Sequence, residues 1–354
     1  MSLALSKTLA EIGEKALLRH IQGRVGSGPG VVVGLGDDAA VVEMPPLALL
    51  TTDSLVEGAH FRRDEAPARL LGRKALTVNL SDVAAMGGIA RYATVSLCLP
   101  PDLSLEWVDS LYDGLLERAA ESGVALVGGN VTRVREAIVV DVALVGEAGR
   151  VLLRKGAQPG DRVVVTGTLG AAAEGVRLLA EGARLDEDGQ LRETGVWTES
   201  SAPAVLFCLR ALLDPRPPLA LARSVAERGL ARAGMDLSDG LSRDLVEICV
   251  AGGSLGAVLD AARLPVDPKA AGLERARGGD ALALALHGGE DYQLLLAVAP
   301  EAVSELGELA RVWGVETSTV GEFVEGETSV RIRDAAGERP LVPGGWDHFS
   351  AGPI

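Results

Sequence analysis

The chain has 354 residues and a formal net charge of −15, with hydrophobic residues at 47% and charged residues at 23%. This composition is that of an ordinary globular protein and excludes wholesale disorder. The negative charge disfavours nucleic acid and anionic membranes as partners, because binding to phosphates relies on Lys and Arg. A phosphorylated ligand would be repelled too, unless a divalent cation mediated the contact.

The length predicts about two domains at roughly 150 residues each, and we expect them at residues 1–150 and 151–354. Cys98, Cys208 and Cys249 are widely spaced, so they predict neither a disulfide framework nor a zinc site and are interpreted as small buried hydrophobes. The charged N-terminal helix is unlike a signal peptide, and no apolar stretch reaches the ~18 residues of a membrane span. We therefore expect a cytoplasmic protein in a reducing compartment.

The first half of the chain reads as strands and helices that alternate with acidic turns. Residues 31–42 predict strand, turn and strand, and the next strand is expected to end in Thr51, Thr52 and Asp53. Apolar spacing predicts a helix over 68–86, with Asn79, Ser81 and Asp82 near its far end. A second helix is expected between Ser104 as cap and Gly123 past the end, followed by strands at 124–129 and 137–146.

The second half begins with a strand at VVVTGT, after which the polar Arg184–Ala202 stretch and the Pro-rich LDPRPPL predict an excursion or long loop. Helices are expected at 219–229 and 241–250 on either side of the turn MDLSDG. A strand at 257–260, a helix at 280–286, the segment HGGEDYQLLLAVA and a closing pair of strands complete the pattern.

Six short acidic motifs set among Gly, Ser or Thr are spread along the chain: GLGDDAA, TTDSLVEGAHF, NLSDVAAMGG, GGNVT, MDLSDG and HGGEDY. Each alone is an ordinary turn or helix cap. Together they indicate a site for a hard divalent cation, because Mg²⁺ and Ca²⁺ take oxygen ligands. The like-charge pairs Asp37–Asp38 and Glu290–Asp291 also need a cation or hydrogen-bond donors to compensate them.

Glycine pairs at 128–129 and 288–289 would let backbone N–H groups approach a phosphate. The chain has no P-loop and no protein-kinase motif, so phosphoryl chemistry would use another scaffold. His60 is equally compatible with a structural and a functional role, whereas His20, His287 and His348 are interpreted as structural or surface residues. Near the C-terminus, Trp346 and Phe349 could stack on a ligand ring or anchor the last strand.

Taken in order, GLGDDAA, TTDSLVEGAHF, KALTVNLSDVAAMG, LVGGNVTR, MDLSDGLSRDL, GGEDYQL and GGWDHF resemble the motifs of the thiamine-monophosphate kinases. The wider superfamily is that of aminoimidazole ribonucleotide synthetase. The resemblance implies an α/β fold of α+β type in two domains, with N-terminal sheets that form a dimeric barrel and a C-terminal α/β domain that completes the active site. It also implies a homodimer that uses ATP and several Mg²⁺ ions to phosphorylate thiamine phosphate.

Residues are carried over from the resemblance by matching motif. The implied metal ligands are Asp38, Thr51 through its backbone, Thr52, Asp53, Asp82, Asn130, Asp236 and Asp239. The implied ATP-binding residues are Tyr112, Gly129, Arg154 and Ser238, and the implied thiamine-side residues are His60, Glu290 and Trp346. Asn130 stands where the family usually has Asp, so we expect weaker Mg²⁺ binding and a higher Mg²⁺ requirement.

No acid or base catalyst is expected, because a phosphate monoester with a second pKa of about 6 is already mostly dianionic at neutral pH. Direct in-line transfer without a phosphoenzyme is therefore predicted. Aminoimidazole ribonucleotide synthetase is the alternative enzyme, since it shares metal and ATP chemistry but not the WDHF-like tail. A Ca²⁺-binding module is the non-enzymatic alternative, although the EF-hand spacing of acids is absent.

Overall fold

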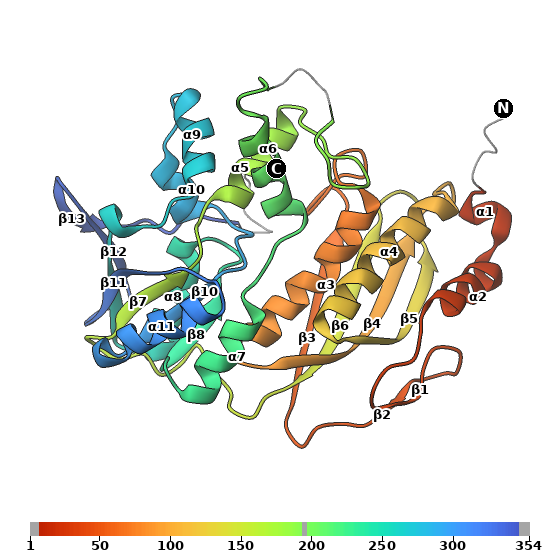
Figure 1. The fold of residues 1–354 in the computed structure, drawn as a ribbon, viewed down its shortest axis with the longest axis horizontal. Coiled ribbons are helices and arrows are strands. Elements are labelled where there is room, and N and C mark those ends of the chain that lie inside the picture. The colour runs from red at the N-terminus through yellow and green to blue at the C-terminus, as the bar shows by residue number, and fades with distance from the viewer. Residues whose placement is uncertain (1–6, 193–196, 347–354) are drawn as a thin grey trace. The chain divides into compact units, whose positions relative to one another are not determined.

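The computed structural model describes residues 7–192 and 197–346, and the chain forms two compact units (Figure 1). Unit 1 takes the chain up to Val83 together with Ala90–Glu147 and Leu185–Gln190. Unit 2 takes Ala84–Ile89, Ala148–Arg184 and the chain from Leu191 onward. Two short segments therefore belong to the opposite unit from their neighbours in sequence.

Unit 1 is built on a four-stranded sheet. Its strands, in spatial order, are β3 (Ala48–Val56), β6 (Val139–Glu147), β4 (Ile89–Leu99) and β5 (Ala125–Arg133). β3 and β6 pair antiparallel, and β4 and β5 pair parallel. Val140, Val142 and Leu144 of β6 are almost fully buried, while the residues between them are partly exposed. This alternation defines a buried face and an open face of the sheet.

Two long helices, α3 (Ala68–Ala85) and α4 (Leu105–Ser122), lie side by side over the sheet (Figure 1). They cross where a side chain on Gly72 would lie 2.0 Å from Leu111 O and one on Gly114 would lie 1.8 Å from Arg69 O. Only glycine allows both backbones to approach so closely. The predicted ends of α4 are confirmed, because Ser104 caps it and Gly123 is left-handed past its last residue.

The N-terminal elements of unit 1 are short. They are α1 (Leu9–Ile12), α2 (Glu14–Arg24) and the antiparallel pair β1 (Val31–Val33) and β2 (Val41–Val42). The last two confirm the predicted strand, turn and strand. His20 of α2 interacts with Asp109 of α4 through Nε2, at 2.5 Å from Oδ1, which agrees with a structural role.

Unit 2 is built on a seven-stranded sheet, antiparallel except where β12 pairs with β9. In spatial order the strands are β13 (Gly337–Pro340), β12 (Val330–Asp334), β9 (Leu255–Asp260), β11 (Thr317–Glu325), β7 (Arg162–Thr166), β10 (Leu294–Val298) and β8 (Ala233–Asp236). The expected closing strand pair is thus wrong, because three strands follow Val315. Every residue of β13 is exposed, so its sequence carries no alternation of burial.

Helices cover both faces of this sheet. Val163 and Val165 pack with α8 (Leu241–Gly252) and α10 (Ala281–His287), whereas Val164 packs with α7 (Leu219–Arg228) and α11 (Val303–Val312). Because successive side chains of β7 point to opposite faces, this one strand contributes to two separate hydrophobic cores. The remaining helices are α5 (Ala171–Ala180), α6 (Ala202–Leu213) and α9 (Pro268–Ala276), which pack together, and the 3₁₀ turns η1 (Ala261–Arg263) and η2 (Pro300–Ala302).

The polar stretch at 184–202 leaves unit 2, contributes Leu185–Gln190 to unit 1, and ends where α6 begins at Ala202. Residues 193–196 of this stretch lie outside the described residues. Cys208 and Cys249 are fully buried, and burial raises the pKa of each thiol to about 12. Cys98 is partly exposed, contrary to expectation, because it lies on the open face of unit 1. None of the described helices is both long enough and apolar enough to cross a bilayer.

Candidate functional site

In unit 1, side-chain oxygen atoms that could bind a metal come together between β3 and α3, on the helix-covered face of the sheet. Thr51 and Asp53 are alternate residues of β3, and both stand opposite buried residues of β6. Thr51 Oγ1 donates a hydrogen bond to Asp82 Oδ2 on α3 at 2.5 Å. The expected end of the strand at Asp53 is wrong, because β3 continues to Val56 as the partner of β6.

Thr52 occupies the other face. Its hydroxyl donates to Asp141 Oδ1 at 3.4 Å, and Ser54 also donates to Asp141. Because side chains alternate along a strand, the Thr52 side chain lies on the opposite face from those of Thr51 and Asp53. Only the backbone of Thr52 is close to these two residues. The side chain of Thr51 therefore contacts the predicted ligand Asp82, whereas that of Thr52 contacts Asp141, which was not among the predicted site residues.

The other predicted metal ligands of unit 1 stand apart. Asn130 of β5 is opposite Ser96 and donates through Nδ2 to Thr132 Oγ1 at 3.0 Å on the open face of the sheet. Asp38 is exposed in the loop between β1 and β2, where its N–H donates to Asp37 Oδ1 at 2.8 Å. A backbone donor therefore compensates Asp37, one member of this like-charge pair.

Two further predicted residues of unit 1 differ in accessibility. Tyr112 is 5% exposed within α4, and burial raises the pKa of its hydroxyl to about 12. This position does not present the tyrosine to a ligand within the unit. His60 Nδ1 accepts the N–H of Val56 at 3.0 Å, so the proton of a neutral ring is on Nε2. Gly129 is exposed on β5.

In unit 2, the loop of residues 236–240, here called the DLSDG loop, joins β8 to α8. Asp236 ends the strand, and Asp244 lies in the first turn of the helix. Asp244 is 2% exposed, and its Oδ2 accepts the N–H groups of Ser238, Asp239 and Gly240 at 3.1, 3.2 and 3.2 Å. One buried carboxylate thus shapes the loop that carries Asp236, Ser238 and Asp239.

Asp244 was not among the predicted site residues. Its only sequence signal is an acid in the first helical turn after the DG pair. Burial, followed by the charges of Asp239 and Asp236, raises the pKa of Asp244 to about 8. Three carboxyl groups therefore crowd one another here, and a bound cation would relieve their repulsion.

The HGGEDY segment packs against the DLSDG loop. The N–H of Glu290 donates to Ser238 O at 2.7 Å, and Glu290 has a left-handed φ of 64°. Asp291 instead accepts the N–H of Gly170 at 3.0 Å, at the start of α5. Desolvation raises the pKa of Asp291 well above its ordinary value. Glu290 therefore belongs to a loop, whereas the side chain of Asp291 caps the start of α5.

The end of the described chain also reaches this loop, because the N–H of Trp346 donates to Asp239 O at 3.2 Å. His348 and Phe349, with the rest of the WDHF motif after Trp346, lie outside the described residues. Asp236, Ser238, Asp239, Glu290 and Trp346 are thus neighbours in unit 2. Arg154 is exposed in the segment that leads into β7.

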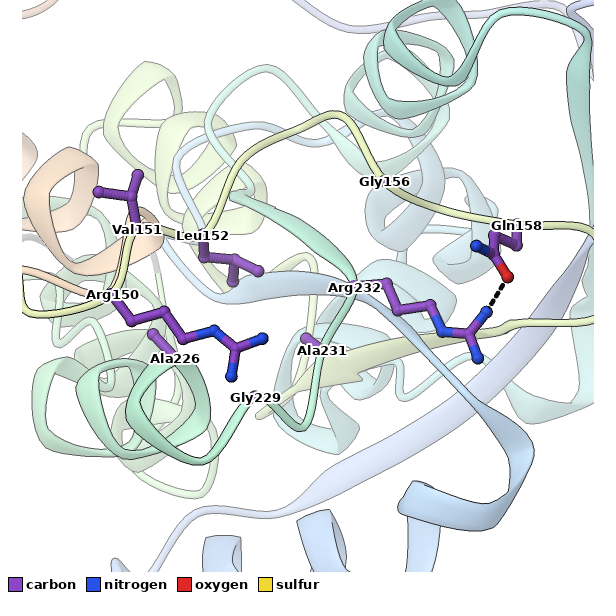
Figure 2. A pocket seen from close by; sticks show the side chains of 9 residues that line it. All are labelled: Arg150, Val151, Leu152, Gly156, Gln158, Ala226, Gly229, Ala231 and Arg232. Carbon is purple, nitrogen blue, oxygen red and sulfur yellow. Dashed lines mark hydrogen bonds between the residues drawn. The ribbon is translucent and has the colours of Figure 1, made fainter.

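A cavity of about 300 Å³ lies elsewhere in unit 2, at the start of β8 rather than at the Asp236 end. Arg150 and Arg232 are among the residues that line it, and Arg232 extends toward Gln158, to which it is hydrogen-bonded (Figure 2). Arg232 also lies near Asp161. No predicted site residue lines this cavity, so it is distinct from the DLSDG loop.

Within residues 7–192 and 197–346, no group of three or more His, Cys, Asp or Glu side chains is arranged to hold an ion. The oxygen donors at Thr51 and Asp82 and at the DLSDG loop nevertheless suit Mg²⁺, which usually binds one or two carboxylates and completes its shell with water and substrate phosphates. The residues therefore fit Mg²⁺ that arrives with a nucleotide.

Comparison with known proteins gives the same architecture. Residues 36–148 match the N-terminal domain of the AIR synthase related proteins, and residues 158–333 match the C-terminal domain. The thiamine-monophosphate kinase of Aquifex aeolicus is 34% identical over 96% of this chain and 99% of its own length. That of Escherichia coli strain K12 is 33% identical over 96% of this chain and 98% of its own.

Solved structures agree. The thiamine-monophosphate kinase of Stenotrophomonas maltophilia superposes with a TM-score of 0.77 at 32% identity, over 89% of this chain and 95% of that chain. AaThiL complexed with AMPPCP and TMP gives a TM-score of 0.74 at 32% identity, over 98% of this chain and all of that chain. The two-domain α/β fold and the resemblance seen in the motifs are confirmed. The chain belongs to the thiamine-monophosphate kinases, within the family of AIR synthase related proteins.

Proposed function

We propose that the chain transfers the γ-phosphoryl group of ATP to thiamine phosphate by direct in-line attack, forming thiamine diphosphate and ADP. Family membership supports the reaction. The structural observation that carries the proposal is the DLSDG loop, whose backbone N–H groups converge on buried Asp244, so that Asp236, Asp239 and Asp244 crowd at the end of β8. Such crowding is costly without a cation, and a metal–nucleotide complex would supply one. The acceptor is already a dianion, so the residues need only align it and neutralise charge.

In unit 1, Asp53 and Asp82 would hold Mg²⁺, and in unit 2 Asp236 and Asp239 would do so. When bound, Mg²⁺ would neutralise the phosphate oxygens that otherwise repel the attacking phosphate. Thr51 would orient the Asp82 carboxylate through its hydroxyl. Asp38 and the backbone of Thr52 would complete this set from unit 1.

Gly129, Arg154 and Ser238 would contact ATP, and His60, Glu290 and Trp346 would contact the thiamine moiety. Ser238 would contact a phosphate through its hydroxyl, because its backbone N–H donates to Asp244 at 3.1 Å and fixes the residue in place. Trp346 offers an indole face to a cationic thiazolium. Tyr112 is left out of this set because it is buried.

Residues 1–150 would form the ATP- and Mg²⁺-binding half and residues 151–354 the half that completes the site. The open face of the unit 1 sheet supports a homodimer, in which two such sheets would form a barrel. Leu50 on this face is 75% exposed, which is unusual for a leucine in the middle of a strand. Light scattering on the purified chain and on a Leu50→Lys variant would test the dimer, with a monomeric variant expected.

A coupled assay for ADP release tests the reaction directly. Thiamine phosphate with ATP and Mg²⁺ is expected to release ADP and yield thiamine diphosphate, whereas thiamine as acceptor is not. Incubation with γ-labelled ATP alone is expected to leave the protein unlabelled. ADP release with the aminoimidazole ribonucleotide synthetase substrate instead, or Ca²⁺ binding without turnover, would contradict the proposal.

A further inference from the structure

Residues 344–346 are fixed to the start of α8 by the buried hydroxyl of Ser242. The N–H of Gly344 donates to Ser242 Oγ at 3.1 Å, and Ser242 Oγ donates to Gly344 O at 3.1 Å. His287 Nδ1 lies 2.9 Å from the same oxygen, and Ser242 has no exposed surface. One hydroxyl thus connects the end of α10, the start of α8 and the C-terminal segment.

The hydrogen bonds determine which nitrogen of His287 carries a proton. A serine hydroxyl has a single hydrogen and two acceptor positions. If that hydrogen goes to Gly344 O, then His287 Nδ1 must itself be the donor to Ser242 Oγ. Burial lowers the pKa of His287, which agrees with a neutral ring protonated on Nδ1. The imidazole therefore acts as a fixed donor here.

Two consecutive glycines allow this close approach. A Cβ on Gly344 would lie 2.5 Å from His287 Nδ1, and one on Gly345 would lie 2.1 Å from Asp239 O. Gly345 also has a left-handed φ of 121°. The next residue, Trp346, donates its N–H to that same carbonyl of Asp239. The backbone of the segment therefore lies directly on His287 and on the DLSDG loop.

We propose that Ser242 and His287 are positioning residues for the acceptor side of the site, because they hold Gly344 and thereby fix Trp346 beside Asp239. This rests on the proposed role of Trp346 at the thiamine moiety. Neither Ser242 nor His287 needs to touch substrate in this arrangement. Loss of either side chain should release the backbone of residues 344–346 on the acceptor side of the site. The DLSDG loop on the ATP side should keep its shape, because Asp244 holds it.

The first test removes the hydrogen bonds and measures both substrates. Ser242→Ala and His287→Ala are each expected to raise KM for thiamine phosphate about tenfold, a usual effect of losing one or two buried hydrogen bonds, with KM for ATP within about twofold of the parent. His287→Asn can place an amide N–H near the Nδ1 position and should restore most of the loss. An equal rise in KM for both substrates, or no rescue by Asn, would overturn the inference.

The second test uses two glycines with the same backbone strain. Gly345 and Gly337 both have φ of 121°, but a Cβ on Gly337 would have nothing within 4 Å. Gly345→Ala and Gly337→Ala should therefore carry similar strain, while only Gly345→Ala raises KM for thiamine phosphate. Equal kinetics of the two variants would count against the inference, since strain without the Asp239 contact would then suffice.

Amide hydrogen exchange separates this inference from the proposed function. The amides of Gly344 and Trp346 should be protected in the parent and exchange faster in Ser242→Ala, whatever the enzyme's substrate. Unchanged exchange would refute the positioning role. Trp346→Ala provides the complementary control: if it leaves KM for thiamine phosphate unchanged while exchange responds as expected, the assignment of Trp346 to the acceptor is wrong and the anchoring role stands.

Discussion

Two groups of acidic residues in the kinase are held in different ways. In unit 1, Asp82 extends from a long helix and meets Thr51 of a long strand through side chains alone. In unit 2, Asp239 lies in a loop whose backbone N–H groups converge on the buried carboxylate of Asp244. The first group depends on how a helix packs on a sheet, and the second on a few hydrogen bonds to one atom.

The difference predicts where each group is sensitive to substitution. Removal of the Thr51 hydroxyl leaves α3 and β3 in place, because large apolar surfaces hold them. Replacement of the Asp244 carboxyl by an amide exchanges one oxygen for an NH₂ group and weakens the acceptor of three backbone N–H groups, so the loop is expected to change shape. Supporting residues should therefore matter more in unit 2 than in unit 1.

Loss of a carboxylate that would bind Mg²⁺ should have the largest effect. Asp82→Ala is expected to lower kcat/KM by about 10³-fold, because charge stabilisation by a metal ion is worth several kcal/mol. Asp113→Ala, which removes an exposed carboxylate of unit 1 paired with Arg24, serves as control and should retain parental turnover. Comparable activity of the two variants would show that Asp82 does not hold a catalytic Mg²⁺.

Asp244→Asn should have the next largest effect. We expect a 10- to 100-fold rise in the Mg²⁺ concentration that gives half-maximal rate, as is usual when a residue supporting metal ligands is lost. Asp267→Asn is the matched control, because Asp267 is also buried and accepts the N–H groups of Lys269 and Ala270 at the start of α9. If both variants shift the Mg²⁺ dependence alike, the effect comes from losing any buried cap and not from the DLSDG loop.

Thr51→Val tests the other side of the comparison. Valine keeps the β-branched shape in the strand but removes the donor to Asp82, so we expect a five- to tenfold loss of kcat/KM from one hydrogen bond. Titration of activity against Mg²⁺ would locate the loss. A greater effect than that of Asp244→Asn would reverse the proposed contrast between the units.

Asn130→Asp tests whether the open face of the sheet takes part. The family resemblance implies a carboxylate at this position, so the variant is expected to lower the Mg²⁺ requirement about threefold through an added charged ligand. In the unit itself, Asn130 lies on the face away from Thr51 and bonds Thr132. An unchanged Mg²⁺ dependence would show that a side chain at position 130, on the open face, does not bind the metal.

The smallest effect is expected at Glu174, which is fully buried in α5 beside Arg277. Burial raises the pKa of Glu174 above its ordinary value of 4.5, despite the opposing charge of Arg277. The resulting stabilisation is complete below pH 4.5 and is lost as pH rises through the folded-state pKa. Glu174→Gln cannot ionise, so its Tm relative to the parent should rise over that pH range and then level off, with kcat unchanged. A Tm difference that falls with pH would contradict this sign.

Local sequence signals predicted much of the fold. Capping at Ser104 and Gly123 gave the limits of α4, and the apolar spacing of 68–86 gave α3, because both depend on neighbours within a few residues. Helices α5, α6, α9 and α11 were not predicted individually. α5 begins with AAAEG, in which small residues on all sides of the helix obscure the apolar periodicity. Its helical conformation depends on packing against α6, which local sequence does not reveal.

The site was predicted less completely, because its chemistry depends on the face of the sheet on which each side chain lies. The acidic motifs were visible as residue types. Thr51 rather than Thr52 faces Asp82 because side chains alternate along β3, whose register is set by its pairing with β6. The like-charge pair Glu290–Asp291 was expected to need a cation or hydrogen-bond donors, and the donor to Asp291 is Gly170, whose distance in sequence hid it from local signals.

The hydrogen bond from Trp346 to Asp239 also has a consequence for biosynthesis. Domains fold as the chain emerges from the ribosome, with the N-terminal parts first. The DLSDG loop and Asp244 are made long before residue 346, so a nascent chain can form the acidic loop without the segment that lies on it. The anchored segment can dock only after residue 346 has been synthesised, so the newly made enzyme gains this part of the proposed acceptor side later than the DLSDG loop.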